Sequence, residues 1–90
     1  MKVVIIMGST SDEPHAKKIT DNLDAMSIEW EQHAASAHKQ PKEVLKILED
    51  NANESSVVYV TIAGRSNALS GFVGANSEFP TIACPPFADK

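Results

Sequence analysis

The chain has 90 residues, of which 42% are hydrophobic and 22% charged, and its formal net charge is −4. This composition predicts a globular protein with a thin core and no membrane partner, since no apolar run approaches the roughly 18–20 residues that span a bilayer. The single cysteine excludes an internal disulfide framework, and the negative charge argues against a nucleic-acid partner, so we expect a cytoplasmic protein.

Strand-like and helix-like segments alternate from the N-terminus onward. Residues 2–7 (KVVIIM) form an apolar, β-branched run that is typical of a strand buried on both faces. Residues 8–12 predict a turn into a helix, with Ser11 or Asp12 as its N-cap. The apolar side of that helix is predicted to contain Ala16, Ile19, Leu23 and Met26. Residues 28–35 predict a more polar second strand, nearer an edge of the sheet.

The second half of the chain continues the alternation. A polar loop at 36–41 leads into a helix, whose apolar side is predicted to contain Val44, Leu45 and Leu48. The segments that follow are a strand at 57–63, a turn at 64–67, a short helix at 68–75 and a short strand at 79–84. This βαβαβαβ order predicts an α/β protein: a three-layer α/β/α fold with a parallel, flavodoxin-like (Rossmann-type) sheet of about four strands.

Three polar loops are predicted to meet at one edge of this sheet. In a parallel sheet the loops that follow the strands lie at the carboxyl edge, where ligands bind. Here they are residues 8–12, 36–41 and 64–67, which together carry several hydroxyls, an imidazole, an ammonium group and a guanidinium group. We therefore expect the functional site at this edge.

The first loop has the features of an anion site. Gly8 allows a ligand to approach the backbone, and the helix N-terminus offers amide groups to an anion. Ser9 and Ser11 can add hydroxyl donors, while Asp12 can accept from sugar hydroxyls. The spacing fits a capped turn without a ligand equally well, and it is neither a P-loop nor a dinucleotide fingerprint.

The second loop places His38 beside Lys39. An imidazole can take or give a proton near neutral pH, although a loop histidine with a local hydrogen bond would have the same sequence. His15 is predicted on an exposed helical turn and His33 on the second strand. These histidines and Cys84 lack metal-ligand spacing, so no metal site is predicted, and Cys84 is expected to be a small buried residue.

The third loop, Gly64-Arg65-Ser66-Asn67, lies between a strand and a helix. It lacks the second glycine of a nucleophile elbow, because Ala68 stands at that position. We therefore expect its amides, Ser66 and Asn67 to bind an anionic or carboxylate group rather than to attack a substrate.

Together these loops resemble those of the PurE family, the aminoimidazole ribonucleotide (AIR) carboxylases and mutases of purine biosynthesis. The matching segments are Ile6–Asp12, Ser36–His38, Ala63–Leu69 and Pro80–Pro86. Lys39 and the third loop resemble class II, whose members use carbon dioxide directly. Because family members are considerably longer, the resemblance implies that residues 1–90 are one AIR carboxylase-like domain, truncated at its C-terminal side.

The resemblance implies the reversible carboxylation of AIR by CO2 to 4-carboxy-AIR (CAIR), a carbon–carbon lyase reaction that needs no cofactor. The catalytic residues that it implies are His38, Lys39 and Ser66. The substrate-binding residues that it implies are Gly8, Ser9, Ser11, Asp12, Ser36, Lys39, Gly64, Arg65, Ser66 and Asn67. A homo-oligomer, an octamer in the family, is implied as well.

In this assignment His38 transfers the ring proton of AIR, and the serines of the first two loops hold the ribose phosphate with Lys39. Asp12 accepts hydrogen bonds from the ribose hydroxyls, and the third loop binds the carboxylate or CO2. The division of these contacts among Lys39, Arg65 and Ser66 stays open. Two alternatives also stay open: a class I mutase that acts on the N5-carboxylated nucleotide, and a non-catalytic nucleotide-binding or assembly module.

Overall fold

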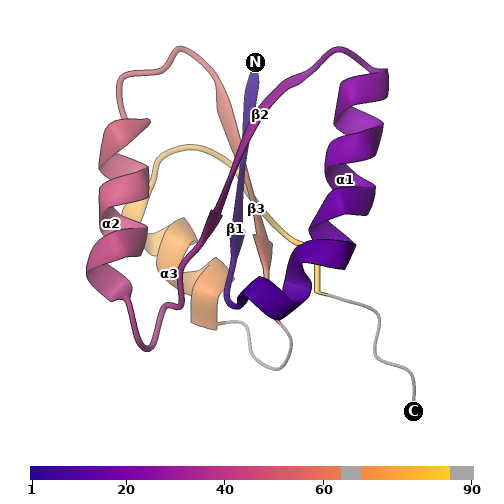
Figure 1. Cartoon of the computed structure of the whole chain (residues 1–90). Helices are drawn as coiled ribbons and strands as arrows, with labels where there is room; N and C mark the ends of the chain where they lie inside the picture. Colours follow the sequence, from indigo (N-terminus) through magenta and orange to yellow (C-terminus); the bar gives the residue numbers. More distant parts are fainter. Residues whose placement is uncertain (64–67, 86–90) are drawn as a thin grey trace.

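The computed structural model of the chain describes residues 1–63 and 68–85. In chain order the elements are β1 (Lys2–Met7), a 3-10 turn η1 (Thr10–Asp12), α1 (Glu13–Ala25), β2 (Glu29–Ala34), α2 (Pro41–Asp50), β3 (Val57–Ile62), α3 (Ala68–Asn76) and β4 (Thr81–Ala83). The predicted alternation is confirmed (Figure 1), with a third helix one residue longer than predicted and a fourth strand half the predicted length.

The strands form one parallel sheet in the order β2-β1-β3-β4. Helix α1 covers one face of the sheet, and α2 and α3 cover the other (Figure 1). This is the predicted three-layer α/β/α arrangement with a flavodoxin-like strand order. In the ladder Met7 lies opposite Ala34 on one side and Ile62 on the other, so β1, β2 and β3 end at the same level.

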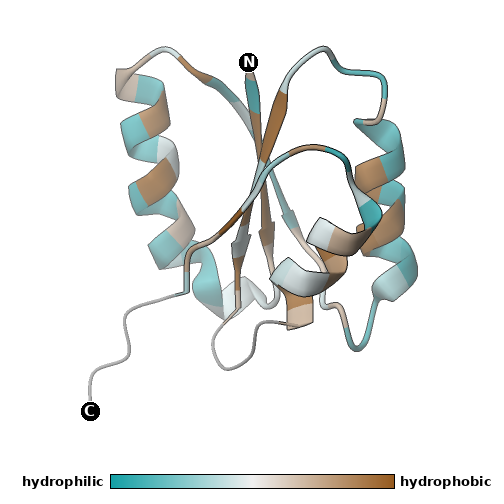
Figure 2. Cartoon of the chain, turned by 180° about the vertical axis from the view of Figure 1, so that it is seen from behind, coloured by the Kyte–Doolittle hydropathy of each residue, from teal (hydrophilic) through white to brown (hydrophobic). Residues whose placement is uncertain are grey.

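The two central strands carry the hydrophobic core. Strand β1 is buried from Val3 to Met7 because helices cover both of its faces. Successive residues point to opposite faces, so Val4 packs with the α2 and α3 side while Ile5 packs with the α1 side. Figure 2 shows that the central strands are mostly hydrophobic and that hydrophobic and hydrophilic stretches alternate along the helices.

Two residues predicted for the apolar helix faces are exposed instead. Met26 is 60% exposed because it is the C-cap of α1, beyond the last residue that packs on the sheet. Leu45 is 41% exposed, and Ile47 is buried together with Val44 and Leu48. Successive residues of a helix are rotated by about 100°, so Leu45 lies off the stripe formed by the other three.

The chain leaves α1 through a residue in the left-handed region that is not glycine. Ser27 has a φ of 57°. Its amide donates to the Asp24 carbonyl at 3.1 Å, and the Ile28 amide donates to the Leu23 carbonyl at 2.9 Å, which together form a Schellman motif. The left-handed conformation brings the serine Cβ close to the backbone, so this position favours glycine.

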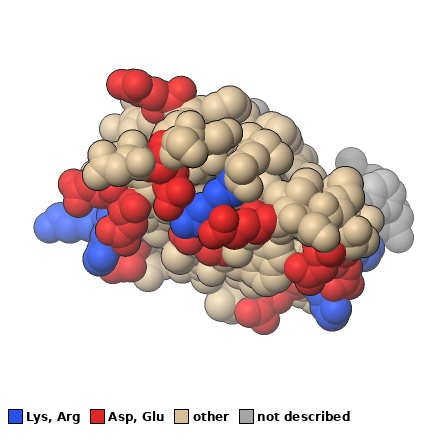
Figure 3. Space-filling view, turned by 90° about the horizontal axis from the view of Figure 1, so that it is seen from above, with Lys and Arg blue, Asp and Glu red and all other residues tan. Residues whose placement is uncertain are grey.

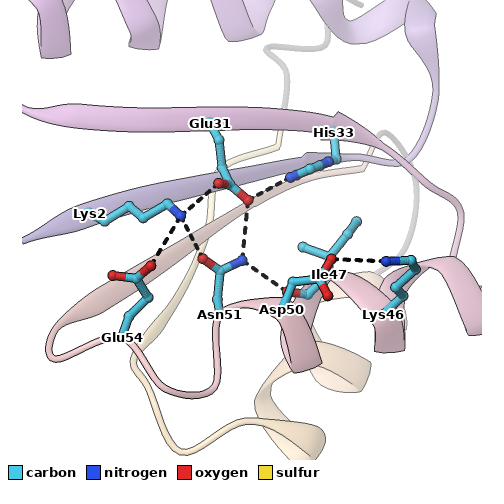
Figure 4. A network of polar contacts seen from close by, with 8 residues as sticks. All are labelled: Lys2, Glu31, His33, Lys46, Ile47, Asp50, Asn51 and Glu54. Atoms are coloured by element: carbon cyan, nitrogen blue, oxygen red, sulfur yellow. Dashed lines mark hydrogen bonds and ion pairs between the residues drawn. The ribbon is translucent and has the colours of Figure 1, made fainter.

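A polar network joins strands β1 and β2 to the C-terminal end of α2 (Figure 4). The Lys2 ammonium lies 2.7 Å from Glu31, 2.8 Å from the Asn51 side-chain oxygen and 3.6 Å from Glu54. Asn51 is 1% exposed, and its amide nitrogen donates to Glu31 at 3.2 Å and to a carbonyl of α2 at 2.9 Å. The second Glu31 oxygen lies 2.7 Å from the His33 ring. Each buried polar group of the network therefore has a partner.

This network changes the pKa of its charged members. Burial alone would raise the pKa of Glu31, but hydrogen bonds from Lys2, His33 and Asn51 outweigh burial and lower the pKa to about 2. The hydrogen bond to Glu31 raises the pKa of Lys2. Because the folded-state pKa of Glu31 lies below its ordinary value of 4.5, the ionised carboxylate stabilises the fold above that pH. The contribution is lost as the pH falls from 4.5 toward 2.

Acidic side chains are spread over the face at the amino ends of the strands, and basic ones are confined to a few places (Figure 3). Two lysines outside the network form helical i,i+4 ion pairs, Lys17 with Asp21 at 3.1 Å and Lys46 with Asp50 at 3.2 Å. No helix in the described part of the chain is long and apolar enough to cross a membrane.

Replacing Ser27 by glycine is expected to stabilise the protein by about 1 kcal/mol, because glycine adopts the left-handed C′ conformation without the Cβ contact. Urea denaturation monitored by circular dichroism measures the change. Ser55→Gly is the matched control, since Ser55 is exposed and has no positive φ, and it should be neutral or slightly destabilising. Equal effects of the two variants would contradict the strain at Ser27.

Replacing Glu31 by glutamine is expected to lower the stability at pH 7 by about 1–2 kcal/mol, after discounting for its partial exposure. The loss should shrink between pH 4.5 and pH 2, because the wild-type carboxylate becomes protonated over that range. Urea denaturation at several pH values measures both quantities. The control is Glu29→Gln, which removes an exposed carboxylate of the same strand and should leave the pH dependence of stability nearly unchanged. If Glu31→Gln also left that pH dependence unchanged, the pKa assignment would be refuted.

Candidate active site

The hydrogen-bond ladder brings the starts of two predicted loops together. The Gly8 amide donates to the Ile62 carbonyl at 2.8 Å, and the Ala35 amide donates to the Met7 carbonyl at 2.7 Å. The loops after β1 and β2 therefore leave the sheet from adjacent points of its carboxyl edge, at the bottom of Figure 1. The third predicted loop, with Gly64, Arg65, Ser66 and Asn67, lies outside the described residues.

The first loop folds into a single 3-10 turn. The Ser9 hydroxyl oxygen accepts from the Ser11 amide at 3.2 Å and lies 2.9 Å from the Ser11 hydroxyl. The Asp12 amide donates to the Ser9 carbonyl at 3.1 Å, and the Glu13 amide donates to the Thr10 carbonyl. Asp12 is the N-cap residue of α1, as one of the two predicted candidates, but its side chain makes no capping hydrogen bond, and the Ser9 side chain caps the 3-10 turn that precedes the helix.

These bonds change which groups can meet an anion. The amides of Ser11, Asp12 and Glu13 are used within the turn, so they are not available as the sequence suggested. Within the described residues the amides of Ser9 and Thr10 make no hydrogen bond. An anion at this loop would be bound by these two amides and the exposed hydroxyls. The Asp12 carboxylate makes no capping bond and can accept a hydrogen bond from a ligand.

The backbone conformation at position 8 does not require glycine, since the φ of Gly8 is not in the left-handed region. A Cβ added there would meet the Ile62 carbonyl oxygen at 3.6 Å and the Ala63 Cβ at 3.7 Å, which are ordinary van der Waals distances. The fold therefore accepts a methyl group at this position. The absence of a side chain leaves space above the sheet edge, where a ligand could approach the backbone.

The second loop is organised by Ser36. Its hydroxyl oxygen accepts from the amides of His38 and Lys39, both at 3.2 Å. The Gln40 amide donates to the Ser36 carbonyl at 2.7 Å, and the Gln40 side chain accepts from the Ser36 amide at 3.4 Å. The hydroxyl oxygen is thus used inside the loop, and its hydrogen remains available for donation to a ligand.

Sequence reasoning did not single out Gln40. The one signal was its position immediately before Pro41, the first residue of α2, where a side chain can close the preceding turn. His38 and Lys39 are exposed, and within the described residues their side chains make no hydrogen bond. The structure therefore holds the backbone of both residues in place and leaves the imidazole and the ammonium group exposed.

The other histidines have different surroundings. His33 lies on β2 as predicted and pairs with Glu31. His15 is half-buried rather than exposed, because its ring lies 3.8 Å from the Cys84 sulfur. Cys84 is also half-buried rather than buried, since it follows the short edge strand β4. The described part of the chain holds no group of three or more His, Cys, Asp or Glu side chains that could bind a metal ion.

A cavity of about 360 Å³ lies away from this edge, between the C-terminal end of α2 and the segment after α3. It is lined by Leu48, Ala52, Asn76, Ser77, Glu78 and Phe79. It contains none of the residues that the sequence analysis proposed for the site.

Comparisons with known proteins agree with the sequence reading. The sequence model of the family described as AIR carboxylase matches residues 2–90. A phosphoribosylaminoimidazole carboxylase of Archaeoglobus fulgidus is 54% identical over 90 residues, which are 100% of this chain and 49% of the relative. The enzyme of the same name from Treponema denticola is 48% identical over 98% of this chain and 56% of the relative.

A solved structure is similar as well. The crystal structure of Treponema denticola PurE has a TM-score of 0.93 and 46% sequence identity, and the match covers 98% of this chain and 56% of that one. The human bifunctional phosphoribosylaminoimidazole carboxylase/phosphoribosylaminoimidazole succinocarboxamide synthetase is 41% identical over 94% of this chain and 20% of its own length. The chain spans about half the length of the archaeal and Treponema relatives.

Replacing Gly8 by alanine is expected to change the stability by less than about 1 kcal/mol while weakening the binding of inorganic phosphate by about fivefold or more, because the methyl group occupies the space above the backbone. Thermal denaturation and titration followed by NMR chemical shifts measure the two effects. Gly71→Ala in α3 is the control: a Cβ there meets nothing within 4 Å, so phosphate affinity should not change. Wild-type affinity in Gly8→Ala would contradict this role.

Proposed function

Because the chain belongs to the AIR carboxylase family, we propose that it carries the first two substrate-binding loops of a class II AIR carboxylase. The reaction is the reversible carboxylation of AIR by CO2 to 4-carboxy-AIR in purine biosynthesis. The observation that carries the proposal is the placement of residues 8–12 and 36–40 at adjacent strand ends, with an exposed imidazole in the second loop.

The chemistry requires one proton acceptor beside the imidazole ring of the substrate. The electron-rich ring carbon of AIR attacks the carbon of CO2, and a carbon–carbon bond forms. The hydrogen on that ring carbon then leaves as a proton, which His38 accepts as general base. In the reverse direction the protonated His38 returns the proton to the ring carbon and CO2 departs. Exposure of the His38 side chain supports this role.

The two described loops have groups suited to the ribose phosphate. We assign the phosphate to Ser9, Ser11, Ser36 and Lys39, with Gly8 leaving room for it. Ser36 contributes through its hydroxyl hydrogen, because its oxygen already accepts from two amides. Lys39 contributes positive charge beside the catalytic imidazole. Asp12 accepts from the ribose hydroxyls, since its carboxylate makes no capping bond.

The third loop completes the proposed site. We assign the carboxylate or CO2 to Gly64, Arg65, Ser66 and Asn67, with Ser66 orienting it for reaction. This assignment rests on the family motif in the sequence.

We further propose that residues 1–90 are the N-terminal part of the family's domain, in a cytoplasmic homo-oligomer, an octamer as in the family. We propose that CO2 is a substrate and that no metal or other cofactor takes part. The net charge of −4 supports the absence of a nucleic-acid partner.

Replacing His38 by asparagine is expected to lower the rate of CAIR decarboxylation by about 10²–10⁴-fold, because the proton then has no positioned acceptor or donor. Loss of the CAIR absorbance in the ultraviolet measures the rate. His33→Asn is the matched control: it removes a histidine that contacts Glu31 and lies outside the loops, so its rate should stay within about twofold of wild type. An unchanged rate in His38→Asn would remove the proposed role.

The Treponema denticola carboxylase is the positive control in the same assay. Binding of CAIR without turnover by the wild-type chain, while the control reacts, would favour a nucleotide-binding module. Turnover of the N5-carboxylated nucleotide without CO2 would favour a class I mutase.

A further inference from the structure

We propose that the contact between His15 and Cys84 positions the first loop and thereby sets the affinity of the site for the substrate phosphate. This inference rests on the proposed function and adds positioning residues to it. The His15 Nε2 atom lies 3.8 Å from the Cys84 Sγ atom, although the two residues are 69 positions apart.

The first loop has no packing of its own. No residue of η1 is buried, so its position depends on the two ends of the segment. At one end the Gly8 amide is fixed by the Ile62 carbonyl at 2.8 Å. The other end is the first turn of α1, where Ala16 is the first fully buried residue. His15 precedes Ala16 and lies one helical turn after Asp12, so a shift of His15 moves the loop.

The partner of His15 is firmly placed. The Cys84 amide donates to the Thr61 carbonyl at 2.8 Å, which extends the β3–β4 ladder by one residue. The Cys84 side chain packs against the core cluster on the α1 side of the sheet. Cys84 is therefore a fixed point against which the start of α1 can be held.

Helix α1 does not cover β4 along its length. Ile82 lies opposite Val60 in the ladder, and it is 55% exposed. Figures 1 and 2 both show the end of β4 arriving beside the first turn of α1. The His15–Cys84 contact is thus the place where this turn is held to the fourth strand.

The contact is weak in chemical terms, which sets the size of the expected effect. A thiol can donate to a neutral imidazole nitrogen, or a protonated ring can donate to sulfur, and both bonds are weaker than those between nitrogen and oxygen. Losing it should shift the loop rather than unfold the helix, because Ala16 and Leu23 still pack on the core. The consequence should be a modest loss of phosphate affinity.

Four variants test this inference: His15→Phe, which keeps a ring without nitrogen, Cys84→Ala, Cys84→Ser and their double combination His15→Phe/Cys84→Ala. Ribose 5-phosphate is titrated into the whole chain, and the amide chemical shifts of residues 9–12 are followed by NMR. His15→Phe and Cys84→Ala should each weaken binding by about three- to tenfold. Cys84→Ser should retain more affinity than Cys84→Ala, and the double variant should bind no worse than the single ones.

Leu23→Val is the matched control, because it loosens the opposite end of α1 without touching the contact. It should lower the melting temperature while leaving the loop shifts and the affinity unchanged. Equal affinities in wild type, His15→Phe and Cys84→Ala, or additive losses in the double variant, would overturn the inference. If the wild type binds no ribose 5-phosphate, the proposed function fails, and the amide shifts of residues 9–12 in the free variants still decide the inference.

Discussion

The parallel ladder on both sides of β1 determines where the other parts of the molecule lie. Strand β1 is buried between β2 and β3, and helices cover both of its faces, so its residues must be apolar on both sides. Because Met7 lies level with Ala34 and Ile62, the chain leaves three strands at one height. The two described loops, those after β1 and β2, become neighbours although 25 or more residues of sequence separate their starts, as the strand bounds show.

Where a buried strand begins, its polar side chains need hydrogen-bonding partners, and the network around Lys2 supplies them. The ammonium at the start of β1 is enclosed by Glu31, Asn51 and Glu54, so little of it meets water. Removing Glu31 would take one acceptor from the Lys2 ammonium and one from the amide of the buried Asn51, and a buried polar group that loses a partner is costly. The network also joins the polar edge strand β2 to α2, where apolar packing alone would be weak.

The candidate site has the opposite character. Its loops have few buried side chains and are shaped by hydrogen bonds within short segments, such as those of Ser9 and Ser36. Both serines use their oxygens to organise the backbone, and Ser36 retains its hydroxyl hydrogen for a ligand. In the Ser9–Ser11 pair one hydroxyl donates to the other, so the pair retains one hydrogen. Hydrogen bonds to neighbouring strands hold the loops where they leave the sheet, so contacts at the loop ends, including the one between His15 and Cys84, influence binding.

The sequence by itself determined the alternation of elements, the apolar central strands and the order of the polar loops, because strand and helix periodicities are local properties. It could not decide between Leu45 and Ile47, because a helix face is fixed by its rotation against the sheet. Tertiary structure alone brought Lys2 to Asn51, 49 residues away, and His15 to Cys84, 69 residues away. Such contacts depend on the register of the sheet, and no local pattern encodes a distance between segments that meet only after folding.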